Sequence, residues 1–129
     1  MSELADLSIL LVEDEYLIAL DAEEILKGLG VKTVETIATF EAAERRAADG
    51  RFDLAVLDVN LNGRQSFPIA ETIGRRGIPV VFATGYELKD RPASGLDDAT
   101  CVTKPYTSER LKAALCEALA KAGSRQMNA

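Results

Sequence analysis

Short apolar runs alternate along the chain with longer amphipathic stretches. Runs of Val, Ile and Leu without polar alternation are typical of strands buried on both faces of a parallel sheet, and amphipathic stretches between them are typical of crossover helices. The pattern predicts an α/β fold with a doubly wound, five-stranded parallel sheet. The five expected strands are Ser8 to Val12, Thr33 to Ile37, Leu54 to Asp58, Val80 to Ala83 and Cys101 to Lys104.

Apolar residues at helical spacing, together with terminal signals, predict four helices between and after these strands. Gly30 and Gly77 each follow a helical pattern as a stop, and Thr39 precedes one as an N-cap. The expected helices are Tyr16 to Leu29, Phe40 to about Gly50, Ile69 to Arg76, and a last helix capped by Thr107 or Ser108 that reaches Ala122.

A further helix belongs between the fourth and fifth strands, but Tyr86 to Ala99 contains Pro92 and Gly95 and almost no apolar repeat. We therefore expect this helix to be weak or irregular. The last residues, 123–129, have no apolar stripe and are expected to form a disordered tail. Residues 1–122 are expected to form one domain, because a chain of 129 residues leaves no room for a second.

The composition of the chain disfavours several classes of function. The chain has 15 Lys and Arg against 21 Asp and Glu, a net charge of −6, which disfavours the phosphate contacts of nucleic-acid binding. No apolar run approaches the roughly 18 residues that span a bilayer, and Glu3 and Asp6 replace a signal peptide's basic opening, so we expect a cytoplasmic protein.

The absence of histidine excludes a Ser-His-Asp triad and a phosphohistidine carrier. Cys101 and Cys116 match no metal or redox spacing and are expected to be buried thiols.

Chemically useful side chains stand where the expected strands end. The first strand is followed by Glu13 and Asp14, the third ends in Asp58, the fourth is followed by Thr84, and the fifth ends in Lys104. In an open parallel sheet the carboxyl ends of the strands form the ligand-binding crevice. These five side chains therefore converge if the strand order is 2-1-3-4-5.

Clustered carboxylates repel one another unless protons or a cation offset their charge, and Mg²⁺ (or Mn²⁺) favours such oxygen ligands. Asp58, at the end of a central strand, could then act as a nucleophile that forms an acyl phosphate. Lys104 and the ion would neutralise the transferred phosphoryl oxygens, and the Thr84 hydroxyl could donate a hydrogen bond to one of them.

Four short motifs together resemble the receiver domain of the response regulators of bacterial two-component signalling, from Ile9 to about Ala122. The motifs are LLVEDE at Leu10 to Glu15, VLDVNL at Val56 to Leu61, ATG at Ala83 to Gly85 and TKPY at Thr103 to Tyr106. The resemblance implies a histidine kinase as phosphodonor, an unidentified downstream protein as partner, and no enzymatic activity beyond the domain's own phosphorylation and dephosphorylation. It also implies that Asp58 is the phosphoacceptor and that the metal is held by Glu13, Asp14, Asp58 and the backbone carbonyl of Asn60.

The resemblance gives Thr84 a switch role and Lys104 a phosphate-binding role. The run from Phe82 to Tyr86 resembles the FAT GUY subgroup more narrowly, which implies a stand-alone receiver served by a kinase of the HWE or related type. Many receivers carry an aromatic residue where this chain has Cys101, so Tyr86 or Tyr106 could replace it in the switch, or the segment after Tyr86 could change its order.

Alternatives stay open from the sequence. Each carboxylate alone could simply solvate a loop or a helix start, and Lys104 could be an exposed charge. The Lys104–Pro105 bond resembles the family's cis peptide, although an X-Pro bond is trans by default. Tyr106 could contact a partner or cover the last helix. Rival functions are a phosphate sink, a pseudo-receiver that is never phosphorylated, and a haloacid-dehalogenase-type phosphatase, which normally needs a second Asp where this chain has Asn60.

Overall fold

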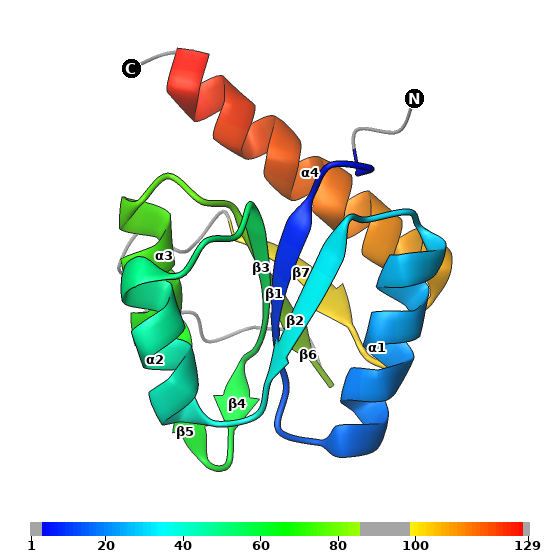
Figure 1. Cartoon of the computed structure of the whole chain (residues 1–129), viewed down its shortest axis with the longest axis vertical. Coiled ribbons are helices and arrows are strands. Elements are labelled where there is room, and N and C mark those ends of the chain that lie inside the picture. The colour runs from blue at the N-terminus through cyan, green and yellow to red at the C-terminus, as the bar shows by residue number, and fades with distance from the viewer. Residues whose placement is uncertain (1–3, 86–98, 128–129) are drawn as a thin grey trace.

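The computed structural model describes residues 4–85 and 99–127. Within them, five parallel strands form a central sheet in the order β2-β1-β3-β6-β7 (Figure 1). The strands are β1 (Ser8–Val12), β2 (Thr33–Ile37), β3 (Leu54–Asp58), β6 (Val80–Thr84) and β7 (Thr100–Thr103). Counted along the chain within this sheet, the order is 2-1-3-4-5, so the predicted fold class and topology are confirmed.

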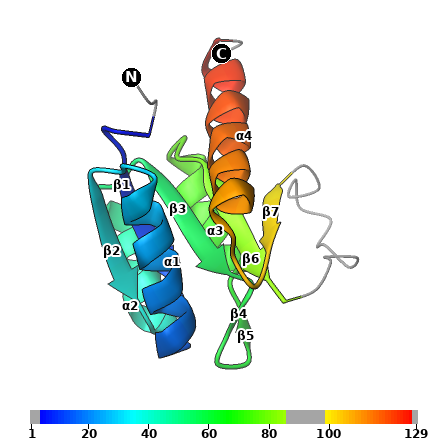
Figure 2. The ribbon, with the colours of Figure 1, turned by 90° about the vertical axis from the view of Figure 1, so that its right-hand side faces the viewer.

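Helices cover both faces of the sheet (Figures 1 and 2). One buried cluster joins the sheet to α1 and α4, and a second joins the opposite face to α2 and α3. The described helices are α1 (Tyr16–Gly28), α2 (Phe40–Asp49), α3 (Phe67–Arg75) and α4 (Ser108–Met127).

Neighbouring residues of the central strands enter opposite clusters. Leu11 packs with the α1 and α4 side, and Leu10 with the α2 and α3 side, and neither is accessible to solvent. Side chains alternate between the faces of a strand, so two covered faces require apolar residues at consecutive positions. Burial of each such leucine contributes about 1.5–3 kcal/mol, and these strands fix the sheet edge where the polar side chains gather.

Helix starts and stops follow the residues that predicted them. The Thr39 hydroxyl accepts a hydrogen bond from the Ala42 N–H at the start of α2. Gly30 and Gly77 follow α1 and α3 with φ of 91° and 79°, a backbone region that glycine enters at little cost.

A small hairpin after β3 was not predicted. Strands β4 (Asn60–Leu61) and β5 (Arg64–Gln65) pair antiparallel around Asn62 and Gly63, whose φ angles are 51° and 86°. Two central residues with positive φ define the tight hairpin turn that Asn-Gly favours. The hairpin projects from the carboxyl end of the sheet in Figure 2.

Other expectations need correction. Helix α4 continues to Met127, so the last helix does not end near Ala122, and the tail expected from residue 123 is helical up to that point. One Gly123 costs only about 1 kcal/mol in a helix, and each further residue adds a hydrogen bond to a helix that tertiary packing has already nucleated. The expected weak helix falls largely on residues 86–98, outside the described residues. Both cysteines are half-buried rather than buried.

Candidate functional site

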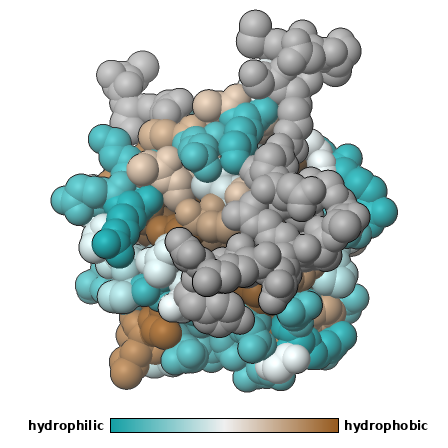
Figure 3. Space-filling model, turned by 180° about the vertical axis from the view of Figure 1, so that it is seen from behind, coloured by the Kyte–Doolittle hydropathy of each residue, from teal (hydrophilic) through white to brown (hydrophobic). Residues whose placement is uncertain are grey.

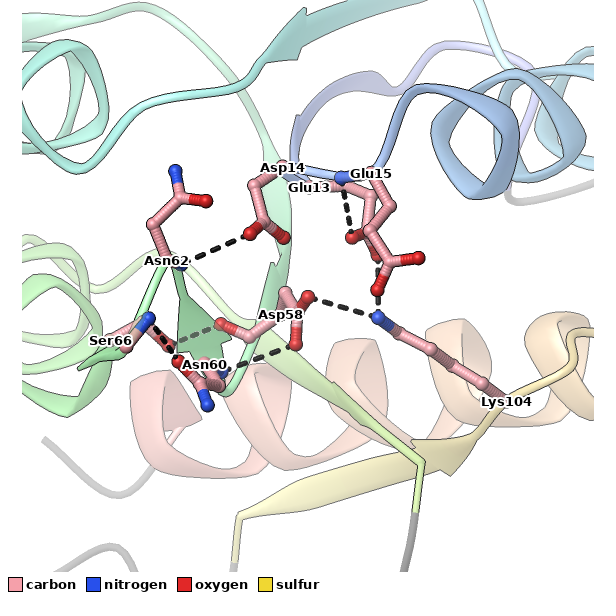
Figure 4. Close-up of polar contacts among 9 residues, drawn as sticks. Glu13, Asp14, Glu15, Asp58, Asn60, Asn62, Ser66 and Lys104 are labelled. Atoms are coloured by element: carbon pink, nitrogen blue, oxygen red, sulfur yellow. Dashed lines mark hydrogen bonds and ion pairs between the residues drawn. The ribbon is translucent and has the colours of Figure 1, made fainter.

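Three carboxylates from two adjacent strands meet at the carboxyl edge of the sheet (Figure 4). Glu13 and Asp14 follow β1, Asp58 ends β3, and one oxygen from each lies within 4.8 Å of the others. Because β1 and β3 are paired in parallel, residues that end the two strands lie side by side. The structure therefore brings together the three acidic residues that the sequence selected.

Lys104 provides the positive charge next to these carboxylates. Its Nζ lies 2.7 Å from Glu13 Oε1 and 2.9 Å from Asp58 Oδ2. Lys104 follows β7, and its backbone N–H donates to the Thr84 carbonyl at 2.8 Å. This hydrogen bond fixes the backbone from which the Lys104 side chain extends. Burial lowers the pKa of the Lys104 ammonium, but the hydrogen-bonded carboxylates of Glu13 and Asp58 together outweigh burial and raise it.

Glu13 is the most deeply buried of the acidic groups, with 2% of its surface exposed. Its Oε2 accepts a hydrogen bond from the Glu15 N–H at 3.1 Å. Burial raises the pKa of the Glu13 carboxyl to about 7, against the lowering effects of Lys104 and the Glu15 N–H, and the neighbouring Asp58 adds to the rise. A second cation at this site would therefore favour the ionised carboxyl.

Asp58 is 7% exposed, and each of its side-chain oxygens has a donor. Oδ2 accepts from Lys104 Nζ at 2.9 Å, and Oδ1 accepts from the Asn60 N–H at 3.2 Å. The Asp58 backbone carbonyl accepts from the Ser66 hydroxyl at 2.6 Å. Both the side chain and the backbone of Asp58 are thus held by the residues that follow β3.

The β4–β5 hairpin reaches back to the carboxylates. The Asn62 N–H donates to Asp14 Oδ2 at 3.0 Å, and the Gly63 N–H donates to the side-chain oxygen of Asn60 at 2.8 Å. Asn60 lies beside Asp58 in Figure 4, where its backbone could join the ligand set. The hairpin therefore links Asp14 and Asp58 although they are far apart in sequence.

The remaining predicted residues lie around this cluster. Thr84 ends β6 and is 4% exposed, Lys104–Pro105 is a cis peptide bond, and Cys101 is a half-buried residue of β7. Tyr106 is 6% exposed, which favours the covering role over a free surface contact, and burial with the nearby Glu13 carboxylate raises the pKa of its hydroxyl. Tyr86 lies outside the described residues.

A pocket of about 580 Å³ opens over the cluster. Asp58 and Lys104 form part of its floor, the hairpin residues Asn62 and Gly63 line one side, and Tyr106 lines another. A phosphate-sized group could therefore reach the Asp58 carboxylate from solvent.

The donor set fits a hard divalent cation. Glu13, Asp14 and Asp58 offer carboxylate oxygens close enough to share one ion, and the pocket leaves room for the water ligands that Mg²⁺ retains. Lys104 already offsets part of the negative charge, which shows that the cluster accommodates positive charge. Carboxylates around an ion beside a half-buried ammonium suit phosphoryl chemistry.

The sequence matches the model of the response regulator receiver domain family over residues 9–116. The chain belongs to this family, whose members receive signals in two-component systems. Among curated proteins it is 31% identical to the sensory transduction protein LytT of Bacillus subtilis, over 84% of this chain and 46% of LytT. It is 28% identical to the phyllosphere-induced regulator PhyR of Methylorubrum extorquens, over 86% of this chain and 43% of PhyR. The chain spans less than half the length of these two relatives.

Solved structures that are similar to this chain support the same family. The solution structure of SdrG from Sphingomonas melonis Fr1 has a TM-score of 0.76 and 42% identity, and the match covers 92% of this chain and 99% of that one. The anti-anti-sigma factor PhyR from Bartonella quintana has a TM-score of 0.79 and 26% identity, over 95% of this chain and 51% of that one. The similarity to SdrG and PhyR fits the FAT GUY subgroup that the run from Phe82 to Tyr86 indicated.

Two residues of the site were missed from the sequence. Asn62 was detectable, because Asn-Gly between short extended segments is a strong hairpin signal. Ser66 carries no such signal, because a serine immediately before a helix ordinarily predicts only an N-cap.

Proposed function

We propose that this protein is a stand-alone, cytoplasmic response regulator that accepts a phosphoryl group from a histidine kinase of the HWE or related type onto Asp58, with Mg²⁺ (or Mn²⁺) bound. The observation that carries the proposal is the convergence of the Glu13, Asp14 and Asp58 carboxylates within 4.8 Å, with Lys104 Nζ 2.9 Å from Asp58. The match to nearly the full SdrG chain supports a receiver that acts without a fused output domain.

The proposed transfer is a displacement at phosphorus by an Asp58 side-chain oxygen. An Asp58 side-chain oxygen attacks the phosphorus of a kinase phosphohistidine, a P–O bond forms, and the P–N bond breaks with its electron pair going to the imidazole nitrogen. We propose that Lys104 neutralises one phosphoryl oxygen and that the Thr84 hydroxyl donates a hydrogen bond to another. Bound Mg²⁺, held by Glu13, Asp14, Asp58 and the Asn60 carbonyl, would offset the charge of the remaining oxygens.

The phosphodonor needs a surface beside the pocket. The first turns of α1 expose three large apolar side chains, and an apolar patch lies over this part of the molecule at the lower left of Figure 3. Tyr16 and Leu17 are 74% and 77% exposed, and Ile18 next to them lines the pocket. A protein that covers this patch brings its phosphohistidine to Asp58.

The output is proposed to be altered contact with a downstream protein. Thr84 ends β6 and so directly precedes the segment that begins after Gly85, while Cys101 lies on the neighbouring strand β7. A groove of about 280 Å³ runs between β7 and α4. Phosphorylation that moves Thr84 would change this face, with Tyr86, Cys101 and Tyr106 as the proposed switch residues.

A single labelling experiment tests the proposal. The protein is incubated with Mg²⁺ and acetyl phosphate, and its intact mass is measured. We expect the mass of one added phosphoryl group, which disappears with EDTA and in Asp58→Asn. Label that persists in Asp58→Asn would move the acceptor elsewhere, and no label in the native protein would favour a pseudo-receiver.

A further inference from the structure

We propose that Ser66 is a positioning residue that holds the Asp58 backbone in place for phosphorylation. The inference rests on the proposed function. Ser66 is fully buried, and its hydroxyl donates to the Asp58 carbonyl at 2.6 Å across eight residues of chain. Nothing in the sequence alone marks this residue as part of the site.

The use of this hydroxyl is unusual for its position. Ser66 is the N-cap residue of α3, and a serine there normally accepts a hydrogen bond from an N–H of its own helix. Its hydroxyl makes no such cap contact and donates to Asp58 instead. The helix therefore gives up a stabilising contact while the phosphoacceptor strand gains one.

Ser66 also closes the base of the β4–β5 hairpin. Its N–H donates to the Val59 carbonyl at 2.8 Å, so consecutive carbonyls of Asp58 and Val59 both accept from the one residue. On the other side of the strand end, the Val59 N–H donates to the Ala83 carbonyl at 3.0 Å. The backbone that carries the nucleophile is thus fixed from two directions.

The same hairpin carries the other residues of the site. Between Val59 and Ser66 lie Asn60, whose N–H donates to Asp58 Oδ1, and Asn62, whose N–H donates to Asp14. A change at the hairpin base therefore moves the nucleophile and its neighbours together. Water cannot take the place of the Ser66 hydroxyl, because the residue has no accessible surface.

Loss of the Ser66 hydroxyl should consequently slow the transfer even when metal and donor are saturating. Displacement of a reacting group by about 1 Å can cost on the order of a hundredfold in rate, so we expect a loss on the order of tenfold or more. The expected effect is on the limiting rate, and not merely on the concentration of Mg²⁺ that gives half the rate.

The test compares Ser66→Ala and the nearly isosteric Ser66→Cys, whose thiol is a weak donor, with the native protein. Thr72→Ala is the matched control, because the Thr72 hydroxyl also donates to a backbone carbonyl, that of Pro68 at 3.2 Å, but on the exposed side of α3. Rates of acetyl-phosphate labelling are measured across Mg²⁺ concentrations, at a temperature where circular dichroism shows each protein folded.

We expect both Ser66 variants to lose limiting rate while Thr72→Ala keeps the native rate. Native limiting rates in a folded Ser66→Ala or Ser66→Cys variant would overturn the inference, and so would an equal loss in Thr72→Ala. If Ser66→Ala does not fold, the limiting rate of Ser66→Cys alone tests the inference. A native protein that takes no label would instead defeat the proposed function, so the two failures are distinguishable.

Discussion

Replacement of Asp14 by Asn tests whether the three carboxylates form a divalent-cation site. The substitution removes one negative charge but keeps a side-chain oxygen that can accept from the Asn62 N–H. Its effect on stability should therefore depend on whether metal is present. Without metal, Asp14→Asn should be more stable than the native protein. With metal, Asp14→Asn should gain less stability from the bound ion than the native protein does.

The magnitude follows from the distances. Two unit negative charges 4.8 Å apart repel by about 3.5 kcal/mol at an effective dielectric constant of about 20. Asp14 faces the Asp58 carboxylate and the Glu13 carboxyl, and Glu13 is only partly ionised near neutral pH because its pKa is raised to about 7. The ammonium of Lys104 offsets part of the repulsion, and the half-exposed position of Asp14 screens more of it. We expect Asp14→Asn to raise the free energy of unfolding in EDTA by about 1 kcal/mol, or by roughly 3–5 °C in Tm.

Added Mg²⁺ should make the native protein more stable to unfolding than Asp14→Asn. A ligand at a hundred times its Kd stabilises the folded protein by about 2.7 kcal/mol, and this gain needs an intact site. Urea unfolding followed by circular dichroism, in EDTA and across a Mg²⁺ titration, measures both effects. The reasoning is refuted if Asp14→Asn gains as much stability from Mg²⁺ as the native protein, or if Mg²⁺ stabilises neither.

Three further predictions concern single contacts. Lys104→Met leaves two buried carboxylates without their cation and should lower the free energy of unfolding in EDTA by about 3 kcal/mol; urea denaturation showing native stability would contradict this ion-pair account. Leu26→Ala, at a position with no accessible surface, should lower the free energy of unfolding by about 2–5 kcal/mol. The control Leu17→Ala, at an exposed position, should change it by less than about 0.5 kcal/mol. Equal losses of stability in thermal melts of the two variants would count against the assigned core. Thr39→Ala removes the cap of α2 and should cost about 1 kcal/mol in the same melts, with Thr39→Ser as the variant that keeps the cap.

The sheet was predictable because its physics is local and repetitive. Three of the five strands, β1, β2 and β3, have the predicted bounds. Strands β1 and β3 are covered on both faces and so need apolar residues at consecutive positions, and β3 is buried throughout. The convergence of Glu13, Asp14 and Asp58 followed from the same topology. Strand ends in a parallel sheet share one edge, so a correct order of strands also predicted which side chains meet.

What the sequence did not predict depends on hydrogen bonds between residues that a local pattern does not connect. The Ser66 hydroxyl could have capped α3, and only the path of the hairpin brings it to the Asp58 carbonyl. The end of α4 was missed because residues 123–129 have no apolar stripe, yet helical hydrogen bonding continues through Gly123 to Met127 without one. Within the described residues no helix is both long and apolar enough to cross a membrane.

The most direct test of the central claim is the position of the acyl phosphate in the chain. After labelling with acetyl phosphate and Mg²⁺, borohydride reduction converts a phosphorylated aspartate to homoserine, and peptide mass spectrometry then locates the altered residue. The account predicts homoserine at position 58 and at no other aspartate. Homoserine at another position, or an unmodified Asp58 in protein that carries the label, would contradict it.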